Sequence, residues 1–231
     1  MRINRFLLST GLLAFASGAL TQTAMAQLSQ KSKSSANTEA QYEVGGGFGE
    51  SFYQSKSLTS TTATGDAGFN NGIAISAWIG NNMYKKLSGE FHYDYQMNDL
   101  KLSSGGTNVT FGGKSHGFHY DVLYHCTDTK AKVRPYVLAG GGFKLYQGTG
   151  TESAYQALNK FAVLTNTSEL KPMVTFGGGV KFALSSHISL RLEVRDNMSP
   201  FISKIILPVN GASPSGWMNN FVPLIGISYV F

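Results

Sequence analysis

The sequence predicts an all-β fold, an eight-stranded antiparallel up-and-down transmembrane β-barrel preceded by a cleaved signal peptide. Three observations predict it. Segments of alternating apolar and polar residues recur along the chain, and the connections between them alternate between long and short. The chain also ends on an aromatic residue, Phe231, with apolar side chains at almost every second position before it. The 27 glycines and the 12% aromatic content fit a protein made of strands and turns.

Residues 1–26 have the three parts of a secretory signal peptide. A basic start contains Arg2 and Arg5, an apolar run follows, and the small residues Ala24 and Ala26 predict cleavage after Ala26. A membrane anchor is the alternative, but serine, threonine and glycine interrupt the apolar run, which is shorter than a helical span of about 20 residues. We expect residues 27–40 to be a flexible polar segment and 41–231 to be the barrel.

Bulk properties exclude several other classes. The formal net charge is +6, but the lysines and arginines are not clustered in blocks along the chain, so we expect no nucleic-acid partner. The single cysteine, Cys126, excludes an internal disulfide framework, and we expect its thiol to be buried or in an interface. A mean hydropathy of −0.08, with no later apolar stretch of about 18 residues, argues against a helical membrane protein.

The eight expected strands have period-two patterns, and their connections follow one rhythm. The strands are expected near 41–53, 71–80, 86–97, 114–126, 134–147, 172–184, 187–198 and 220–231. Long connections follow the first, third, fifth and seventh strands, and short turns follow the second, fourth and sixth. Outer-membrane barrels have short periplasmic turns and long extracellular loops, and an even strand count places both termini in the periplasm.

Alternation within each strand assigns a lipid face and a lumenal face. In segment 187–198, Ile188, Leu190, Leu192 and Val194 alternate with polar residues. The polar set then faces a lumen that eight strands leave only wide enough for side chains. Its predicted charge network is Glu43, Glu90, Asp94, Asp121, Lys144, Lys181, Arg191, Glu193 and Arg195. Buried charges are tolerated when they are paired, so we expect a plugged lumen. Glycines at 45, 47, 49, 140 and 142 either leave room for long side chains or serve strand curvature.

Three stretches resemble one known family: RPYVLAGGGFKLY at 134–146, LRLEVRDN at 190–197 and the terminal GISYVF. The chain resembles the outer-membrane β-barrel domain family, whose eight-stranded members include the OmpA transmembrane domain, OmpX-type and opacity-type proteins. The periplasmic domain of OmpA is not expected here, because nothing follows Phe231. The resemblance also implies that Phe221, Ile225, Ile227, Tyr229 and Phe231 form the signal read by the barrel-assembly machinery. An unpaired edge strand is a template for strand addition, which fits that role.

Two patterns could carry chemistry. His187 and Ser189 share a strand face, with Glu193 further along, and resemble the His-x-Ser of a lipid A deacylase. Their place beside a short turn argues against that, so we expect no enzyme. His119 and His125 also share a face, but six residues of strand separate them by about 20 Å, so they form no chelate. Cross-strand pairing of His92 with His119 stays open. No metal and no cofactor are expected.

The sequence therefore predicts a monomeric outer-membrane barrel of a Gram-negative bacterium, in contact with outer-membrane lipid and lipopolysaccharide. The first hypothesis is a structural or surface-interaction, adhesin-like protein whose loops 148–171 and 199–219 would bind any extracellular ligand. The alternative is a narrow porin-like channel for small solutes or ions. A lipid A-modifying barrel enzyme is a more remote alternative.

Overall fold

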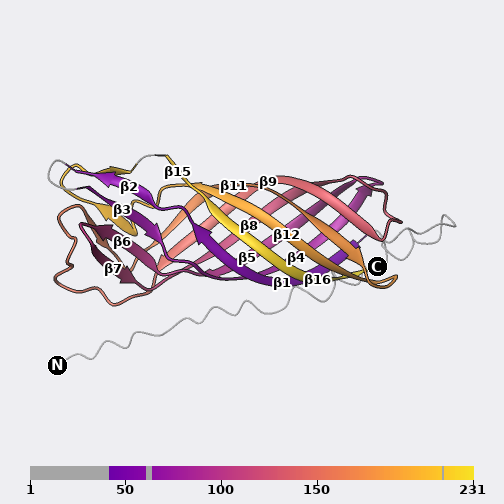
Figure 1. Cartoon of the computed structure of the whole chain (residues 1–231), viewed down its shortest axis with the longest axis horizontal. Coiled ribbons are helices and arrows are strands. Elements are labelled where there is room, and N and C mark those ends of the chain that lie inside the picture. Colours follow the sequence, from indigo (N-terminus) through magenta and orange to yellow (C-terminus); the bar gives the residue numbers. More distant parts are fainter. Residues whose placement is uncertain (1–41, 61–63, 215) are drawn as a thin grey trace, which may run out of the picture. The chain divides into compact units, whose positions relative to one another are not determined.

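A computed structural model of the chain describes residues 42–60, 64–214 and 216–231, and these residues contain strands and no helix. Eight of the strands close into an antiparallel barrel, as predicted (Figure 1). They are β1 (Tyr42–Tyr53), β4 (Gly72–Tyr84), β5 (Leu87–Met97), β8 (Gly113–His125), β9 (Val133–Gly148), β11 (Ser168–Ala183), β12 (Ile188–Pro200) and β16 (Asn220–Val230). Each strand pairs with its neighbours in the chain order, and β16 pairs with both β1 and β12 to close the ring.

Strand positions agree with the sequence prediction to within four residues, and the largest shifts are at the end of β4, which continues to Tyr84 instead of residue 80, and at the start of β11. This strand begins at Ser168 instead of residue 172, because its ladder with β9 continues up to the pair Ser168 and Gln147. The three short connections lie at one end of the barrel, which we call the turn end. The long connections lie at the opposite end, which we call the cap end.

The long connections form a small structure of their own, which the sequence analysis expected only as loops. A five-stranded sheet has the order β14-β2-β3-β6-β7, and β10 pairs with β13. The bounds are β2 (Lys56–Thr59), β3 (Thr64–Phe69), β6 (Leu100–Ser104), β7 (Thr107–Phe111), β10 (Ala162–Leu164), β13 (Ile206–Pro208) and β14 (Ser213–Pro214); the short β15 (Trp217–Met218) extends the barrel wall beside β12. We call this structure, built from residues 54–60, 64–70, 98–112, 149–167, 201–214 and 216–219, the cap.

The cap has a hydrophobic core that continues into the mouth of the barrel. Inward-facing Tyr53 and Tyr146, at the cap ends of β1 and β9, belong to the same buried cluster as side chains from all the long connections. The cap contributes Leu58, Ala67, Phe69, Leu100, Leu102, Phe161, Ala162, Leu164, Phe201, Ile202, Ile205, Ile206 and Met218. The larger apolar core of the described residues therefore lies at the cap end, and a smaller buried cluster of Leu123, Tyr136 and Leu138 lies inside the barrel.

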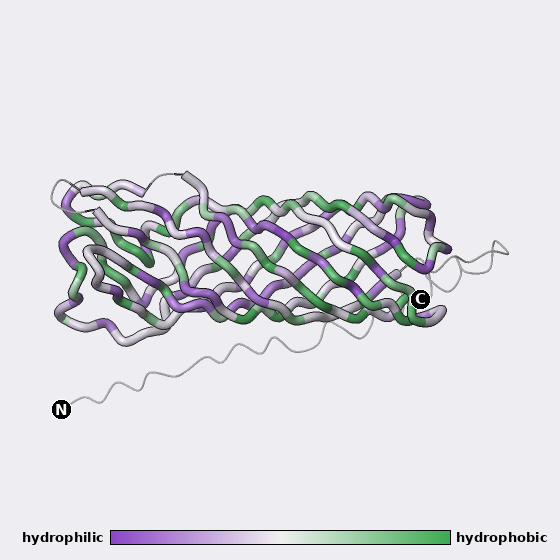
Figure 2. Tube along the Cα trace, viewed as in Figure 1, coloured by the Kyte–Doolittle hydropathy of each residue, from purple (hydrophilic) through white to green (hydrophobic). Residues whose placement is uncertain are grey.

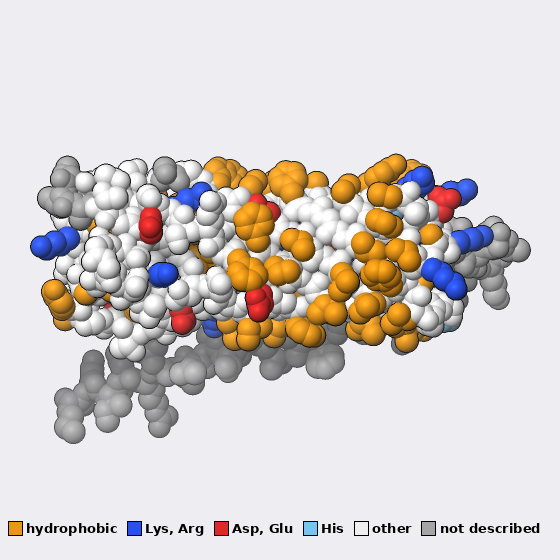
Figure 3. Space-filling view, in the orientation of Figure 1, with side chains coloured by type: hydrophobic (Ala, Val, Ile, Leu, Met, Phe, Trp, Pro, Cys, Tyr) orange, Lys and Arg blue, Asp and Glu red, His pale blue; other side chains and the backbone are white. Residues whose placement is uncertain are grey.

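The barrel wall has an inside-out arrangement of polarity. Hydrophobic and polar positions alternate along its strands (Figure 2). On β12, Leu192 and Val194 are 43% and 53% exposed, whereas Arg191 and Glu193, which alternate with them, are 0% and 3% exposed. Apolar side chains cover much of the barrel surface, and fewer of them lie on the cap (Figure 3). Outward apolar and inward polar side chains are the reverse of a water-soluble barrel and suit a hydrocarbon environment.

The search for helical membrane spans gives no candidate in the described part of the chain. The expected signal peptide, its cleavage residues Ala24 and Ala26, and the polar segment 27–40 lie outside the described residues.

Candidate functional site: the charged lumen

The nine charged residues predicted for the lumen all lie inside the barrel. Each is buried, with exposed fractions between 0% for Arg191 and 7% for Glu43. They come from six strands: β1 (Glu43), β5 (Glu90, Asp94), β8 (Asp121), β9 (Lys144), β11 (Lys181) and β12 (Arg191, Glu193, Arg195). Strands β5 and β12 lie opposite each other in the eight-membered ring, so their charges meet across the axis.

Arg191 is the centre of a first cluster near the turn end. Its guanidinium donates to Glu43 Oε1 at 2.9 Å and to Glu90 Oε2 at 2.8 Å, and it contacts the second oxygen of Glu90 as well. Lys181 Nζ donates to the same two carboxylates, at 2.6 Å to Glu43 and 3.2 Å to Glu90. Two acids and two bases therefore neutralise one another through hydrogen-bonded pairs, which is the arrangement that makes buried charges tolerable.

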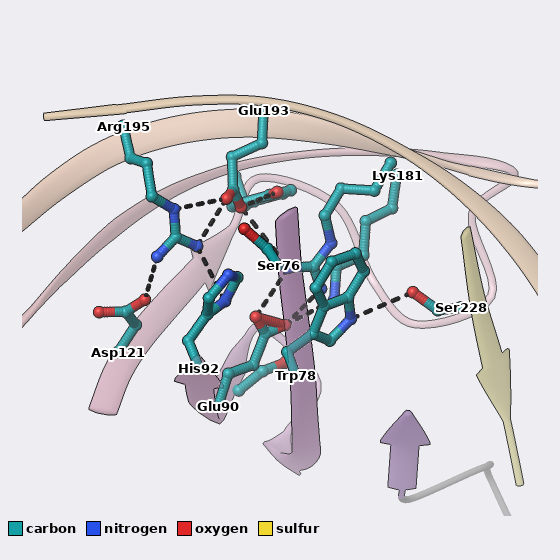
Figure 4. Close-up of polar contacts among 12 residues, drawn as sticks. Ser76, Trp78, Glu90, His92, Asp121, Lys181, Glu193, Arg195 and Ser228 are labelled. Atoms are coloured by element: carbon teal, nitrogen blue, oxygen red, sulfur yellow. Dashed lines mark hydrogen bonds and ion pairs between the residues drawn. The ribbon is translucent and has the colours of Figure 1, made fainter. Parts of the chain in front are cut away.

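Trp78 of β4 contacts this cluster from one side, and it was not among the lumenal residues expected from the sequence. Its indole N–H lies 3.3 Å from Glu43 Oε1 and 3.2 Å from the hydroxyl of Ser228, and the Arg191 guanidinium stacks 4.2 Å from its ring (Figure 4). Gly45 makes room for this ring, because a Cβ there would lie 2.5 Å from the indole. Of the two explanations for the inward glycines, Gly45 supports the one in which they leave space, although an aromatic ring fills it here.

Arg195 organises a second cluster closer to the cap. It donates to Glu193 Oε1 at 2.7 Å through Nε and to Asp121 Oδ2 at 2.8 Å through Nη1. Tyr136 of β9 donates its phenol proton to Glu193 at 2.5 Å, and Thr175 of β11 donates to Asp121 at 2.5 Å. Glu193 also lies 3.5 Å from Arg191, so the two clusters are continuous.

Two histidines complete the network around Asp94. His119 has Nδ1 at 2.9 Å from Asp121 and Nε2 at 3.1 Å from Asp94, and Ser76 donates to Asp94 at 2.5 Å. A neutral imidazole has a single N–H. Both carboxylate contacts are therefore satisfied together only when His119 is an imidazolium. In that form His119 would be a cationic partner for Asp94, with which no lysine or arginine in the described residues pairs; a neutral His119 would instead accept at Nε2 from Arg195 Nη1, 3.4 Å away.

His92, Asp94 and His119 also have the composition of a metal site, with ligand atoms within 4.8 Å of one another. The two imidazole rings are stacked, with centroids 4.9 Å apart and planes at 15°, so their in-plane lone pairs lie in two nearly parallel planes instead of meeting at one point. The Arg195 guanidinium also lies 3.2 Å from His92 Nδ1, where it would repel a cation. This geometry favours a hydrogen-bonded network over a chelate, and it realises the cross-strand pairing of His92 with His119 that the sequence left open.

Lys144 stands apart from the network. It is fully buried, and its amine donates to Gln96 and Asn220 at 2.8 Å each instead of to a carboxylate. The rings of Tyr53 and Tyr146 lie 5.0 and 5.4 Å from the amine, within the range of a cation–π interaction. Among the described residues no acid lies within ion-pair distance of Lys144, so the expectation of a paired lumenal lysine fails at this position.

The deacylase-like residues are not brought together. His187 is exposed and stacks on Tyr229, with its Nδ1 at 2.8 Å from the Ser186 hydroxyl, whereas Ser189 is buried in the lumen. Glu193 accepts hydrogen bonds from Arg195 and Tyr136 instead. Cys126 is exposed beside the β8–β9 turn, so the expectation that it is buried is wrong, whereas its place in an interface stays a prediction.

The terminal aromatic stripe faces outward. Phe221, Ile225, Ile227, Tyr229 and Phe231 are between 40% and 55% exposed. Phe231 stacks on Tyr42 of β1 with centroids 6.0 Å apart, and it exchanges backbone hydrogen bonds with that residue. The end of the chain is therefore part of the seam that closes the barrel.

The family model for the outer membrane protein beta-barrel domain matches residues 11–221. The chain belongs to this family of outer-membrane β-barrels. Its apolar outer face therefore lies in the bacterial outer membrane, and the charged network described above is the lumen of a membrane-spanning barrel. A search of curated proteins finds no match.

Solved structures with the same fold include two small outer-membrane barrels. OprG from Pseudomonas aeruginosa superposes with a TM-score of 0.55 at 13% identity, covering 83% of this chain and 96% of OprG. The neisserial surface protein A superposes with a TM-score of 0.51 at 13% identity, covering 82% of this chain and 97% of that protein. At this identity the likeness shows the shared fold alone.

Proposed function

We propose that this barrel is a structural and surface-interaction protein of the outer membrane, whose cap is a rigid extracellular binding platform. The observation that carries the proposal is the hydrophobic core of the cap, which is continuous with Tyr53 and Tyr146 at the barrel mouth. Loops without a core fluctuate, whereas side chains fixed on a packed sheet present a preorganised surface to a partner.

The proposed orientation places the cap outside and both termini in the periplasm. Short turns at one end and long connections at the other support this, because outer-membrane barrels have short periplasmic turns. The ends of the barrel sequence lie together, since Tyr42 and Phe231 exchange backbone hydrogen bonds. In this orientation the aromatic stripe from Phe221 to Phe231 would be read by the assembly machinery before the seam with β1 closes. We also propose that the barrel works as a monomer among outer-membrane lipid and lipopolysaccharide.

Packing into the cap core reduces the part of the two long loops that could contact a ligand. Of the two loops expected to bind, 148–171 contributes Phe161 and Leu164 to the core, and 199–219 contributes Ile202 and Ile205. These four side chains are buried in the core and are not accessible to a ligand. The exposed residues of these two loops lie mainly at 151–155, 159–160, 203–204, 210–213 and 216–217, and the tip of the β6–β7 hairpin is exposed as well.

A closed lumen supports the interaction role over conduction. Ion pairs cross the axis in two connected clusters, and the cap core covers the mouth above them. The narrow channel remains the second candidate because some buried polar atoms between these layers, Gln96 Nε2, Asn98 Oδ1 and Asn197 Oδ1, have no hydrogen-bond partner in the described protein. Groups of this kind are commonly satisfied by water, and a file of waters would be a path for small ions.

Single-channel recording in planar bilayers tests the proposal. The purified barrel is expected to show no steady conductance. As a matched control, Arg191→Ser with Glu90→Ser removes a cross-axis pair and should produce measurable openings. Steady conductance of the parent protein would instead support the channel. Orientation is tested separately by inserting an epitope between Gly105 and Gly106 and labelling intact cells with antibody; labelling only after permeabilisation would contradict it.

A further inference from the structure

A polar pocket lies on the outer wall of the barrel, apart from the lumen and from the apolar core of the cap. Its volume is about 310 Å³, and Lys114, Gln147, Gly148, Thr149, Asn166, Thr167 and Ser168 line it. The strand register explains its position. Lys114 of β8 pairs with Gln147 of β9, and Gln147 pairs with Ser168 of β11, so three outward polar side chains stand side by side on adjacent strands.

The pocket lies at the upper margin of the apolar surface. The next outward positions toward the turn end are His116, Leu145 and Leu170, and Leu170 is 62% exposed. Two residues of strand span about 7 Å, and the tilt of barrel strands reduces this to roughly 5 Å along the membrane normal. The side chains of the pocket are therefore at the height of lipid headgroups and within reach of a molecule anchored in the outer leaflet.

The backbone walls of the pocket are fixed, and two of its polar side chains are free to bind a ligand. Backbone hydrogen bonds hold the loop in place, from Gly148 N–H to the Thr167 carbonyl at 2.9 Å and from Thr149 N–H to the Gly112 carbonyl at 2.7 Å. By contrast, the Lys114 amine has no ion pair or hydrogen bond to the described residues, and the Gln147 side chain has none either. The one acid nearby, Glu152, accepts a hydrogen bond from Asn166 N–H at 2.6 Å.

These groups match a sugar that carries a phosphate. An ammonium binds phosphate as a point charge, and amide and hydroxyl side chains exchange hydrogen bonds with sugar hydroxyls. The charge around the wall is asymmetric, because the outward carboxylate of Glu50 lies on β1, three strands away from β8. An anionic headgroup is therefore attracted to the Lys114 side of the barrel and repelled on the Glu50 side.

We infer that this pocket, centred on Lys114, binds the phosphorylated sugar headgroup of an outer-leaflet glycolipid. The inference rests on the proposed orientation, since only a cap that faces outward brings the pocket to that leaflet. It gives the barrel a lateral lipid site with a fixed position and adds to the interaction surface proposed for the cap.

Native mass spectrometry of the full barrel, released from detergent micelles, tests this inference with bisphosphorylated lipid A as the probe. Lys114→Gln should weaken retention of the glycolipid about tenfold, the scale expected when a charged hydrogen bond is lost. Lys114→Arg should restore most of the binding. The matched control Lys160→Gln removes the same charge from an exposed cap site outside the pocket and should bind like the parent.

Three results would overturn the inference. Equal retention by Lys114→Gln and the parent would exclude the pocket, and equal binding of dephosphorylated lipid A would exclude phosphate recognition. Displacement of lipid A by glucose 6-phosphate at matching affinity would show that the site serves soluble sugar phosphates instead of a membrane lipid. The binding assay uses purified barrel, so its result does not depend on which end of the barrel faces outward in the cell. Failure of the lipid inference can therefore be distinguished from failure of the proposed orientation, which the epitope test measures.

Discussion

Removal of the Arg191 charge is the sharpest test of the lumenal network. Arg191→Met keeps most of the side-chain volume and the contact with Trp78, but it deletes the pairs to Glu43 and Glu90. Among the described residues, those two acids then keep Lys181 as their only basic partner, at 2.6 and 3.2 Å, and Glu43 keeps its contact with the Trp78 indole. A buried charge that loses its partner costs about 3–5 kcal/mol. The folding equilibrium should therefore fall by between about a hundred and several thousandfold.

Urea unfolding in lipid vesicles, followed by tryptophan fluorescence, measures this loss. Lys171→Met is the matched control, because its pair with Glu169 has a similar distance of 2.8 Å but its lysine is 20% exposed. Glu169 keeps a hydrogen bond from the backbone N–H of Lys204 when this lysine is removed, so the loss should be smaller than that for Arg191→Met. The double variant Glu90→Gln with Arg191→Met should recover part of the loss, since an orphaned acid is removed. If Arg191→Met unfolds within about 1 kcal/mol of the parent, the lumen is hydrated and the buried network is not its stabilising element.

Three further predictions concern the wall, the terminus and the cap. Val194→Arg, on the outward face, should destabilise the barrel by about 2–4 kcal/mol in vesicle refolding, whereas Val194→Leu should not; equal stability of both would contradict the assigned faces. Deletion of Phe231 should slow membrane insertion in cells more than it lowers the unfolding free energy of the purified barrel, and unchanged surface levels would contradict the assembly role. Leu102→Ala should cost the cap about 2–5 kcal/mol and expose it to trypsin while the barrel stays resistant; simultaneous digestion of both would show that they unfold as one unit.

The barrel could be predicted from the sequence because its period-two pattern is long and repeated. Eleven or more residues of alternation fix both a strand and its faces, and the lengths of the connections order the strands. The charges followed from the same pattern, since Arg191 and Glu90 stand at inward positions of their strands. Their pairing across the axis needs only the eight-membered ring, in which β5 and β12 are opposite.

The cap and the finer contacts could not be predicted in the same way. Leu100 and Leu102 on β6 alternate with polar residues, but strands of two to six residues are too short to be separated from loops by periodicity. The isolation of Lys144 depends on strand stagger, which places Gln96 and Asn220 beside it where an acid was expected. His119 became part of the network only when register placed it between Asp94 and Asp121.

The packed core of the cap restricts where foreign peptides can be displayed on this protein. Insertions near Phe161 or Ile205 would separate side chains that are fully or almost fully buried and would loosen the whole platform. The hairpin tip differs, because Gly105 and Gly106 have positive φ angles of 54° and 81° and open space around them. A grafted antigen or affinity tag therefore has its best-tolerated site at this tip.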